Sequence, residues 1–489
     1  MTVPNASGSA PDSAEPEDPN ASIRKWYLIT LFIACFGGGM ISLASTYIIY
    51  DQTGSLSITG LIVVATNLPS LVFPGWATRL ANRWGGAKLY FISGVALGVI
   101  GFVPAILLAL GDLTTASLLV WYLVGGAIFG LSSPASGLLR RSIAAPGMVP
   151  EFNSAATRSV SIATVLGLLI GGALFAAVGP TWIYMISAVA HFPICWAVYP
   201  AMKLAIADDK VSGGRFMDSF AVRRTHPGLR AAFYFTGFCF LIGGYVITFP
   251  AMADSIGTNA GILSLLQAAA VVGGLFVVVA VRKIHGRVGW GKVQRICFLV
   301  AGVGMVVLAW INNQAASPTI TLVIALLAIV PIGFALNLDA SILNALVQVA
   351  APRESRTSVL TYFALIPTLA IPLAQELIGG LSDVTTVSTA LYAVGAVTLV
   401  LIGFGPQRKM RPAFDSLDET AAPPERFPVS SHVARPDIVT AYAPATSPGT
   451  VSAGGSYDDT SIGVIEAEVG PIADQSPGPE LPDRPEGER

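Results

Sequence analysis

Two carboxylates stand out in this sequence because apolar residues surround them. Asp339 and Glu376 each lie well inside a long apolar run. Ionisable side chains are costly to keep in such runs, which makes them candidates for function. An apolar environment disfavours the charged form of a carboxylate, so such a group binds and releases protons closer to neutral pH. We therefore predict proton-binding roles for Asp339 and Glu376, with a hydrogen-bonded structural role as the alternative for each.

Uncharged polar residues inside the apolar runs predict a cavity. Asn337, Ser341 and Asn344 follow one another at spacings of four and three, which places them on one face of a helix, with Asp339 on another. Such a stripe is typical either of a cavity wall or of hydrogen bonds between helices. The predicted cavity residues are Asn67, Asn337, Ser341, Asn344 and Tyr245.

No catalytic or metal-binding pattern accompanies these residues. The sequence has no phosphate-binding loop of the G-x-x-x-x-G-K-[ST] type and no Ser/His/Asp set outside the apolar runs. We expect His191 to be a hydrogen-bonded packing residue. The cysteines share no metal-ligand spacing and are expected to be small buried residues: Cys35, Cys195, Cys239 and Cys297. We therefore expect no enzyme activity, no metal site and no cofactor.

The chain is 53% hydrophobic and only 12% charged, whereas a soluble domain carries about a quarter charged residues. A helix needs about 20 apolar residues to cross a bilayer. Lipid offers the backbone no hydrogen-bond partner, so apolar runs of this length are expected to be helical. The sequence predicts an all-α membrane protein with twelve transmembrane helices in two halves of six. The runs lie at about 26–50, 57–78, 89–110, 116–139, 158–179, 181–202, 231–253, 260–281, 293–312, 318–349, 357–380 and 385–405.

The basic residues alternate along these runs. The connections near 51–56, 111–115, 180, 254–259, 313–317 and 381–384 contain no Lys or Arg. Lys and Arg collect on the cytoplasmic side of membrane proteins, so we expect both termini in the cytoplasm and the helices in the cytoplasmic (inner) membrane. The basic residues form short separate clusters instead of one stripe, which argues against a nucleic-acid partner.

Polar segments divide the chain. Residues 1–25 and 406–489 are polar and acidic, and the second of these has 13 prolines in 84 residues. This composition predicts disordered cytoplasmic segments. A cytoplasmic linker at 203–230 separates the predicted half 26–202 from the predicted half 231–405. The C-terminal tail is interpreted as a solubilising extension or, alternatively, as a docking segment for a cytoplasmic partner.

The two halves resemble each other weakly. Residues 83–88 match 287–292, residues 144–146 match 350–352, and residues 171–172 match 379–380. The offsets are nearly equal, at 204, 206 and 208 residues. A parallel repeat of two six-helix halves is typical of one large class of secondary transporters, in which substrate binds near the midplane between the halves.

The stretches 50–55 and 74–85 resemble the junction of the first three spans in the major facilitator superfamily. The similarity is to a branch that includes enterobactin-exporter-like and macrolide-efflux-like proteins. In the family, the loop after the second span has the pattern G-x-L-A-D-R-x-G-R-R/K. Here Asn82 stands in place of the Asp, and Thr78 in place of the first Gly; the retained residues are Leu80, Ala81, Arg83, Gly85 and Lys88.

The resemblance implies a gating role for Asn82, Arg83, Gly85 and Lys88. Because Asn lacks the charge of Asp, a latch through Asn82 is expected to be weaker. For Arg83 and Lys88 the alternative is a role in setting membrane topology alone.

Two further features of the family are altered in the fourth and fifth spans. The basic residue usual in the middle of the fourth span is missing, and Arg140 and Arg141 at its end are expected to mark the membrane surface. The pattern Gly167-x-x-x-Gly171-Gly172 lacks the Pro that the family's antiporters have, and close helix packing is the preferred interpretation.

The resemblance implies a secondary active transporter that exports a small amphipathic molecule, such as a drug, siderophore or secondary metabolite, by alternating access. Proton coupling is a further implication, although the first span has no acidic residue before Asp51. The expected partners are a small-molecule substrate and the lipid bilayer. Two alternatives stay open: an importer or lipid flippase, and a non-transporting scaffold or signalling protein that acts through its tail.

Overall fold

The computed structural model describes residues 20–72, 74–145, 148–203, 227–257, 259–277, 280–281, 289–314, 317–351 and 356–404. Within these ranges the chain forms helices and no strand. Among the described residues, nine helices are long and apolar enough to cross a membrane, and three shorter apolar helices accompany them, at Leu56–Val72, Ala260–Leu275 and Val387–Leu401. Each of the twelve predicted runs contains one of these helices, so the prediction of an all-α membrane fold is confirmed.

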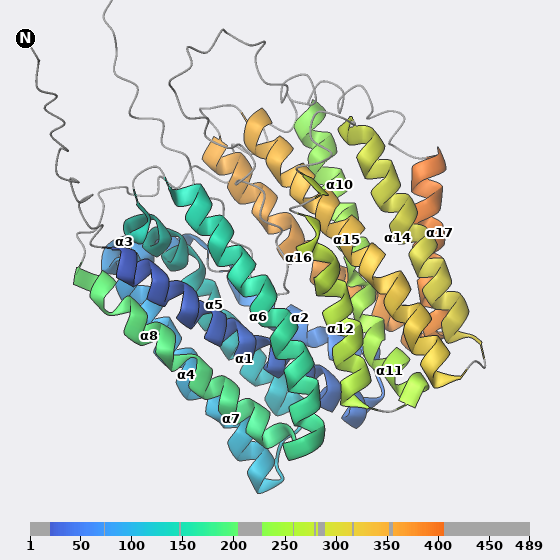
Figure 1. Ribbon diagram of the computed structural model, residues 1–489, viewed down its shortest axis with the longest axis horizontal. Helices are drawn as coiled ribbons and strands as arrows, with labels where there is room; N and C mark the ends of the chain where they lie inside the picture. Colours follow the sequence, from blue (N-terminus) through green and yellow to red (C-terminus); the bar gives the residue numbers. More distant parts are fainter. Residues whose placement is uncertain are drawn as a thin grey trace, which may run out of the picture. The chain divides into compact units, whose positions relative to one another are not determined.

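The first group of helices occupies the blue to green part of Figure 1. It consists of α1 (Ala21–Thr53), α2 (Leu56–Val72), α3 (Pro74–Trp84), α4 (Gly86–Leu110), α5 (Thr115–Ile143), α6 (Val149–Val178), α7 (Pro180–Ala190), α8 (Phe192–Val198) and the short η1 (Pro200–Lys203).

The second group follows in yellow-green to red. It consists of α10 (Pro227–Gly243), η2 (Gly244–Thr248), α11 (Phe249–Gly257), α12 (Ala260–Leu275), α14 (Trp290–Asn312), α15 (Pro318–Ala350), α16 (Arg356–Val384) and α17 (Val387–Phe404). The predicted tail 406–489, and most of the predicted segments 1–25 and 203–230, lie outside the described residues.

Local sequence determines where several helices begin and end. Gly54 ends α1 and Gly111 ends α4, with φ angles of 62° and 79° that glycine adopts at little cost. Thr114 begins α5 by accepting a hydrogen bond from the backbone of Ser117, and Ser317 begins α15 in the same way.

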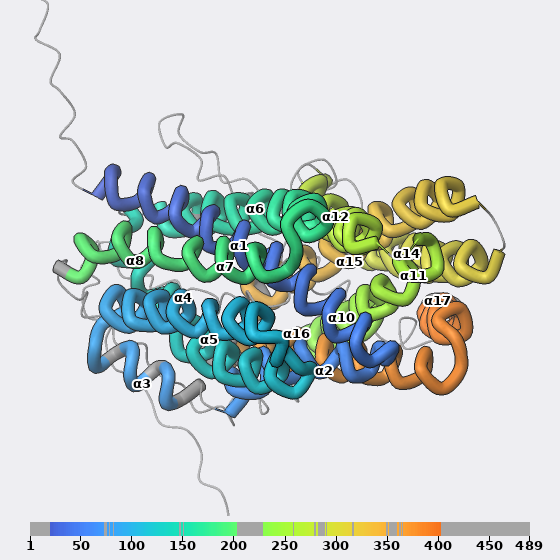
Figure 2. Tube along the Cα trace, turned by 90° about the horizontal axis from the view of Figure 1, so that it is seen from below, coloured from blue at the N-terminus to red at the C-terminus, as the bar shows by residue number. Residues whose placement is uncertain are grey.

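The two groups of helices repeat one packing pattern. Helix α4 contacts α5 and α7, as α14 contacts α15 and α17. Helix α2 contacts α5 as α12 contacts α15, and α1 contacts α6 as α10 contacts α16. Contacts between the groups join α2 to α16 and α6 to α12, and Figure 2 shows these pairs from below. The shared pattern supports the internal repeat inferred from the sequence.

Glycines allow α6 to approach α1 closely. A Cβ atom on Gly167 would collide with the backbone of Phe36, and one on Gly171 would lie 3.1 Å from the Cα of Met40. The next residue, Gly172, faces Ser264 of α12 in the same manner. The packing interpretation of this glycine pattern is confirmed, and it extends to the contact between the two halves.

Two predicted runs are interrupted. The run 57–78 is helical on both sides of residue 73, which lies outside the described residues, so a single span there stays a prediction. Helix α3 carries exposed Trp76 and Trp84 and packs against α5, as α2 does. The run 181–202 breaks at His191, and the run 231–253 contains the 3₁₀ segment η2.

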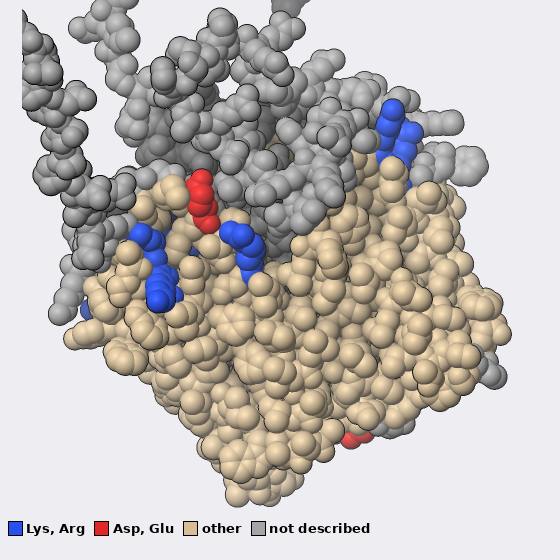
Figure 3. Space-filling model, viewed as in Figure 1, with Lys and Arg blue, Asp and Glu red and all other residues tan. Residues whose placement is uncertain are grey.

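Charged residues mark the two ends of the helices. One end, called the acidic end below, carries Asp51, Asp112, Asp254 and Asp383. Hydrogen bonds from Gln52 to Leu113 O and from Asn312 to Ser388 join the chain at this end. The opposite or basic end carries Lys88, Arg141 and Lys292 among others. On the face in Figure 3 the charged side chains lie toward the edges, with a broad uncharged band between them.

Candidate functional site

A cavity of about 460 Å³ lies between the two halves. Its walls come from α1, α2, α4, α5, α6, α8 and the α7–α8 junction of the first half and from η2, α11, α12 and α16 of the second. Cavities of 300 to 1,000 Å³ are typical of sites for small molecules. The site therefore has a suitable size for a small organic ligand and is formed jointly by both halves.

Aromatic side chains supply one wall of the cavity. Trp121, Tyr122 and Phe129 come from α5, and Phe249 comes from α11. The rings of Trp121 and Tyr122 meet edge to face with centroids 4.8 Å apart, and the Trp121 Nε1 donates a 2.8 Å hydrogen bond to Ile100 O. These fixed rings offer apolar faces to the body of a ligand.

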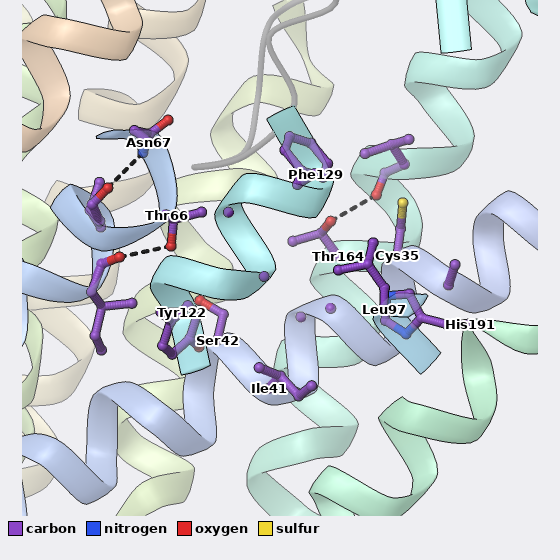
Figure 4. Close-up of a pocket in the computed structure, with 18 of the residues that line it drawn as sticks. Cys35, Ile41, Ser42, Thr66, Asn67, Leu97, Tyr122, Phe129, Thr164 and His191 are labelled. Carbon is purple, nitrogen blue, oxygen red and sulfur yellow. Dashed lines mark hydrogen bonds between the residues drawn. The ribbon is translucent and has the colours of Figure 1, made fainter. Parts of the chain in front are cut away.

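Small polar side chains lie among these apolar groups. The hydroxyls of Thr46, Thr66 and Thr164 donate to carbonyls of their own helices at 2.7, 2.7 and 2.9 Å. Such hydroxyls keep lone pairs free to accept a hydrogen bond. Asn67, a predicted cavity residue, is among the lining residues; its Nδ2 donates to Val63 O at 2.9 Å, while its side-chain oxygen points the other way (Figure 4).

Two glutamines bring polar groups from the second half. Gln267 of α12 and Gln375 of α16 line the cavity, and the Oε1 atom of each is buried without a hydrogen-bond partner among the described residues. A buried amide without a partner costs free energy.

Arg140 lines the cavity at its basic end. Its Nε donates a 3.1 Å hydrogen bond to the hydroxyl of Tyr27, which is only 1% exposed. The expectation that Arg140 marks the membrane surface stays a prediction, and the structure adds that the residue lines the cavity. Tyr27, packed against Tyr90 and Phe152, holds the guanidinium there.

His191 is hydrogen-bonded, as expected from the sequence. Its Nδ1 bonds to Ser187 O at 2.8 Å, at the break between α7 and α8. The side chain also lies beside Leu97 and Cys35 and lines the cavity (Figure 4), which the sequence did not indicate.

Glu376 lies where α16 meets α2. Its Oε2 accepts a 2.8 Å hydrogen bond from the Ser57 hydroxyl, while its Oε1 is buried without a partner among the described residues. A Cβ atom on Gly60 would lie 3.1 Å from this Oε1. The predicted proton-binding residue thus belongs to the contact between the halves, one residue after the cavity-lining Gln375.

Asp383 follows two turns later on the same face of α16. Its carboxylate accepts hydrogen bonds from the backbone of Leu56 at 2.8 Å, the backbone of Ser57 at 3.0 Å and the hydroxyl of Ser55 at 2.6 Å. We call the contact of α2 with Glu376, Gly379 and Asp383 the cross-half contact. It lies at the acidic end of the cavity.

Asp339 occupies a different place, in the interior of the second half. It is 1% exposed, and both of its oxygens are buried without a well-formed hydrogen bond within the described part of the chain. The polar groups that interact with it are the amide of Gln294 and the thiol of Cys239. Asp339 is not among the lining residues of the cavity, so the two predicted proton-binding residues do not come together.

The other predicted cavity residues lie outside this lining. Asn337 donates to Gly333 O at 2.8 Å, and Ser341 donates to Asn337 O at 2.7 Å. Asn344 accepts a 3.0 Å bond from Gln348. Tyr245 is 1% exposed, and its hydroxyl has no hydrogen-bond partner among the described residues. A cavity role for these four residues stays a prediction.

The predicted gating residues lie at the junction of α3 and α4. Arg83 is exposed in the last turn of α3, and Lys88 is exposed in the first turn of α4. Gly85 joins the two helices with a φ angle of 84°, which favours glycine. The side chain of Asn82 lies outside the described part of the structure. The junction is a short helix and a turn where a loop was expected, and its gating role stays a prediction.

Among the described residues, no group of three His, Cys, Asp or Glu side chains could hold a metal ion. Three of the four cysteines are buried, as expected, and Cys35 is half-buried and lines the cavity.

Sequence reasoning missed several residues of this site. Gln267 and Gln375 carried a usable signal, because each is an amide within an apolar run. The aromatic residues Trp121 and Tyr122 carried none, since aromatic residues in apolar runs are ordinary packing residues.

Comparisons with known proteins agree with this architecture. A family model described as Major Facilitator Superfamily matches residues 27–375. A search of curated proteins found no match. Among solved structures, the nucleoside transporter NupG is similar at 14% identity with a TM-score of 0.61, covering 80% of this chain and 99% of that one.

Two further structures are similar at the same level. The xylose transporter XylE from E. coli, in an inward open conformation, is 14% identical with a TM-score of 0.58 over 81% of this chain and 98% of its own. A peptide transporter (POT) in complex with sulfate is 14% identical with a TM-score of 0.62, over 81% of this chain and 95% of its own. At this identity the similarity concerns the fold.

Proposed function

Because the chain belongs to the Major Facilitator Superfamily, we propose that it is a secondary active transporter that exports a small amphipathic molecule by alternating access. The observation that carries the proposal is the cavity formed jointly by both halves. At the acidic end, the α2–α16 and α6–α12 contacts join the halves. Alternating access requires these contacts to open while the halves close at the other end.

The distribution of basic residues supports an orientation. With the basic end in the cytoplasm, both termini are cytoplasmic and the cross-half contact faces outward. The structure then corresponds to a state closed toward the outside. The export direction is supported by the sequence resemblance to efflux-type members of the family, and the inner membrane is the proposed location.

The carboxylates support proton coupling as part of this proposal. Glu376 binds Ser57 across the halves, so opening of the contact removes that partner and exposes the carboxylate to protons. Asp339, buried without a hydrogen bond among the described residues, is the second coupling candidate. Either role requires that protonation differ between the open and closed states.

The test is transport of a panel of dyes, antibiotics and siderophores in energised cells or inverted vesicles, with and without a protonophore. Glu376→Gln retains hydrogen bonding without the charge, and Ser57→Ala removes the contact without changing the carboxylate. We expect protonophore-sensitive export that Glu376→Gln abolishes and Ser57→Ala retains. Asp339→Asn is measured alongside to assign the second carboxylate.

The outcomes separate the possible functions. Accumulation of a panel member inside intact energised cells against its gradient would contradict export and support import. Redistribution of labelled lipids between leaflets would support a flippase. Export that is insensitive to the protonophore and to both carboxylate substitutions would refute proton coupling at Asp339 and Glu376.

A further inference from the structure

The cavity contains one charge without a counter-charge. Arg140 is the only Lys or Arg among the described lining residues, and no Asp or Glu is among them. The groups that interact with its guanidinium are Tyr27, Tyr90 and Cys35, all of which are neutral at pH 7 in their ordinary state.

Most hydrogen-bond donors of Arg140 remain available. A guanidinium has five N–H groups, and Tyr27 accepts the bond from Nε. The Tyr27 contact fixes the plane of the guanidinium and leaves the terminal nitrogens as a fork that matches carboxylate or phosphate oxygens. Arg140 is therefore oriented as well as charged.

The carboxylates of the second half do not neutralise this charge. Glu376 and Asp383 are engaged with α2 at the acidic end, whereas Arg140 belongs to the basic end. Asp339 lies outside the cavity lining. A partly buried cation without a counter-charge is unfavourable, and an anionic ligand relieves that cost.

The remaining lining indicates the rest of the ligand. Ser136 precedes Arg140 by one helical turn on the same side of α5 and lines the cavity. Farther along α5 are the aromatic residues Phe129, Tyr122 and Trp121, which also line the cavity. The site thus presents a cation near one end of α5 and aromatic side chains beyond it.

We propose that Arg140 is the anion-binding residue of the cavity and that the ligand is an organic anion with an apolar or aromatic body. The proposal that this anion is transported rests on the proposed function. The anion site itself does not, because it concerns the cavity alone.

The first test measures the charge preference of the cavity with thiol reagents. Cys35 lines the cavity beside Arg140, and Ser136→Cys in a Cys35→Ser background supplies a second thiol. Each is reacted with anionic methanethiosulfonate ethylsulfonate and with the cationic ethyltrimethylammonium reagent, on the full chain. The thiolate attacks the reagent's sulfenyl sulfur, forms a mixed disulfide and releases methanesulfinate. For each cysteine, the modification rate with the anionic reagent is divided by the rate with the cationic reagent. This ratio is then divided by the same ratio for a free thiol in solution.

We expect the normalised ratio to favour the anionic reagent and to fall about tenfold in Arg140→Gln, as expected for loss of one nearby charge in a partly desolvated site. Arg140→Lys is expected to retain the preference. Arg141→Gln is the matched control, because the neighbouring arginine is not among the lining residues. An equal ratio in the unmodified chain and in Arg140→Gln, at both thiols, would overturn the proposal.

The second test identifies the ligand class through protection of the same thiols. The probes are 4-phenylbutyrate, 4-phenylbutyramide and 4-phenylbutylamine at millimolar concentration, which differ mainly in charge. We expect the carboxylate to slow modification most, and Arg140→Gln to remove its advantage. Equal protection by the amine, or none by the carboxylate, would overturn the organic-anion assignment.

Neither test depends on transport. An anion preference in a chain that moves no substrate would refute the proposed function and leave the anion site intact. Transport by a chain without the preference would refute the anion site and leave the proposed function intact.

Discussion

The carboxylate of Asp383 caps the first turn of a helix that begins 327 residues earlier, by accepting a 2.8 Å hydrogen bond from the backbone N–H of Leu56. A carboxylate at a helix N-terminus satisfies free N–H groups and interacts favourably with the helix dipole. Here the cap comes from the opposite half of the protein. The end of α2 is therefore fully capped only while the two halves are in contact.

Asp383→Asn is expected to weaken this contact, because the amide loses the charge and one acceptor. Loss of an N-cap costs about 1 kcal/mol, which corresponds to a roughly fivefold change in a two-state equilibrium. The readout is the modification rate of Thr46→Cys, a cavity residue, by an impermeant reagent added outside cells in a Cys35→Ser background. The rate should rise about fivefold. Asp112→Asn is the control, since Asp112 lies in a connection at the same end. An equal rise in the modification rate for Asp383→Asn and Asp112→Asn would contradict a specific role of Asp383 as the cap of α2.

Gly379→Ala is expected to open the same contact by steric means. Its Cβ would lie 2.9 Å from the backbone of Leu56, so α16 and α2 must move apart. Gly380→Ala is the matched control, because a Cβ there meets nothing within 4 Å. In the Thr46→Cys assay we expect faster modification for Gly379→Ala only. Similar rates for the two alanine variants would show that the close approach does not limit opening.

Asp339→Asn is expected to stabilise the protein. Asp339 is 1% exposed, and the groups that interact with its carboxylate, Gln294 and Cys239, are uncharged. Burying an ionised carboxylate without a counter-charge costs more free energy than burying a neutral amide. Replacing the carboxylate with a neutral amide should raise the midpoint of thermal unfolding in detergent by several degrees. Asp254→Asn, at an exposed aspartate of the same half, should leave it unchanged. A lower midpoint for Asp339→Asn would mean that the carboxylate is already stabilised in the folded state.

Truncation after Arg411 tests the predicted role of the tail. The described helices and the cavity lie within residues 20–404, so the truncated protein is expected to transport at the rate of the full chain. The measurement is initial transport rate per molecule in reconstituted vesicles, with membrane abundance determined by immunoblot. Retained transport together with loss of a protein captured by the full chain would identify the tail as a docking segment. Loss of transport in the truncated protein would contradict the expectation that the cavity functions without the tail.

The sequence was sufficient to predict the fold because membrane solvation imposes simple rules. Long apolar runs must be helical in lipid, and the structure places a helix in each run. The interruptions within two runs were not predicted. His191 separates α7 from α8, and the 3₁₀ segment η2 lies within the run 231–253. Both lie in apolar surroundings that the hydropathy pattern did not divide.

The site was predictable only in part, because a side chain's direction depends on neighbours distant in sequence. Asn67 lines the cavity, but it does so with residues of helices that no local pattern connects to it. Arg140 is the clearest case: its position at a helix end indicated the membrane surface, and the hydroxyl of Tyr27, 113 residues earlier, holds it in the cavity lining. Glu376 was recognised as unusual, but its partner Ser57 could not be inferred from spacing.

The unpaired guanidinium of Arg140 has an electrical consequence. When the described cavity is empty its lining carries one positive charge, and when an organic monoanion is bound the sum is zero. A membrane potential acts on a unit charge with about 2.3 kcal/mol per 100 mV. Voltage would then act mainly on the return of the empty carrier, while the occupied carrier would cross the same field almost unaffected. The rate of the cycle would depend on membrane potential even though the loaded step moves no net charge.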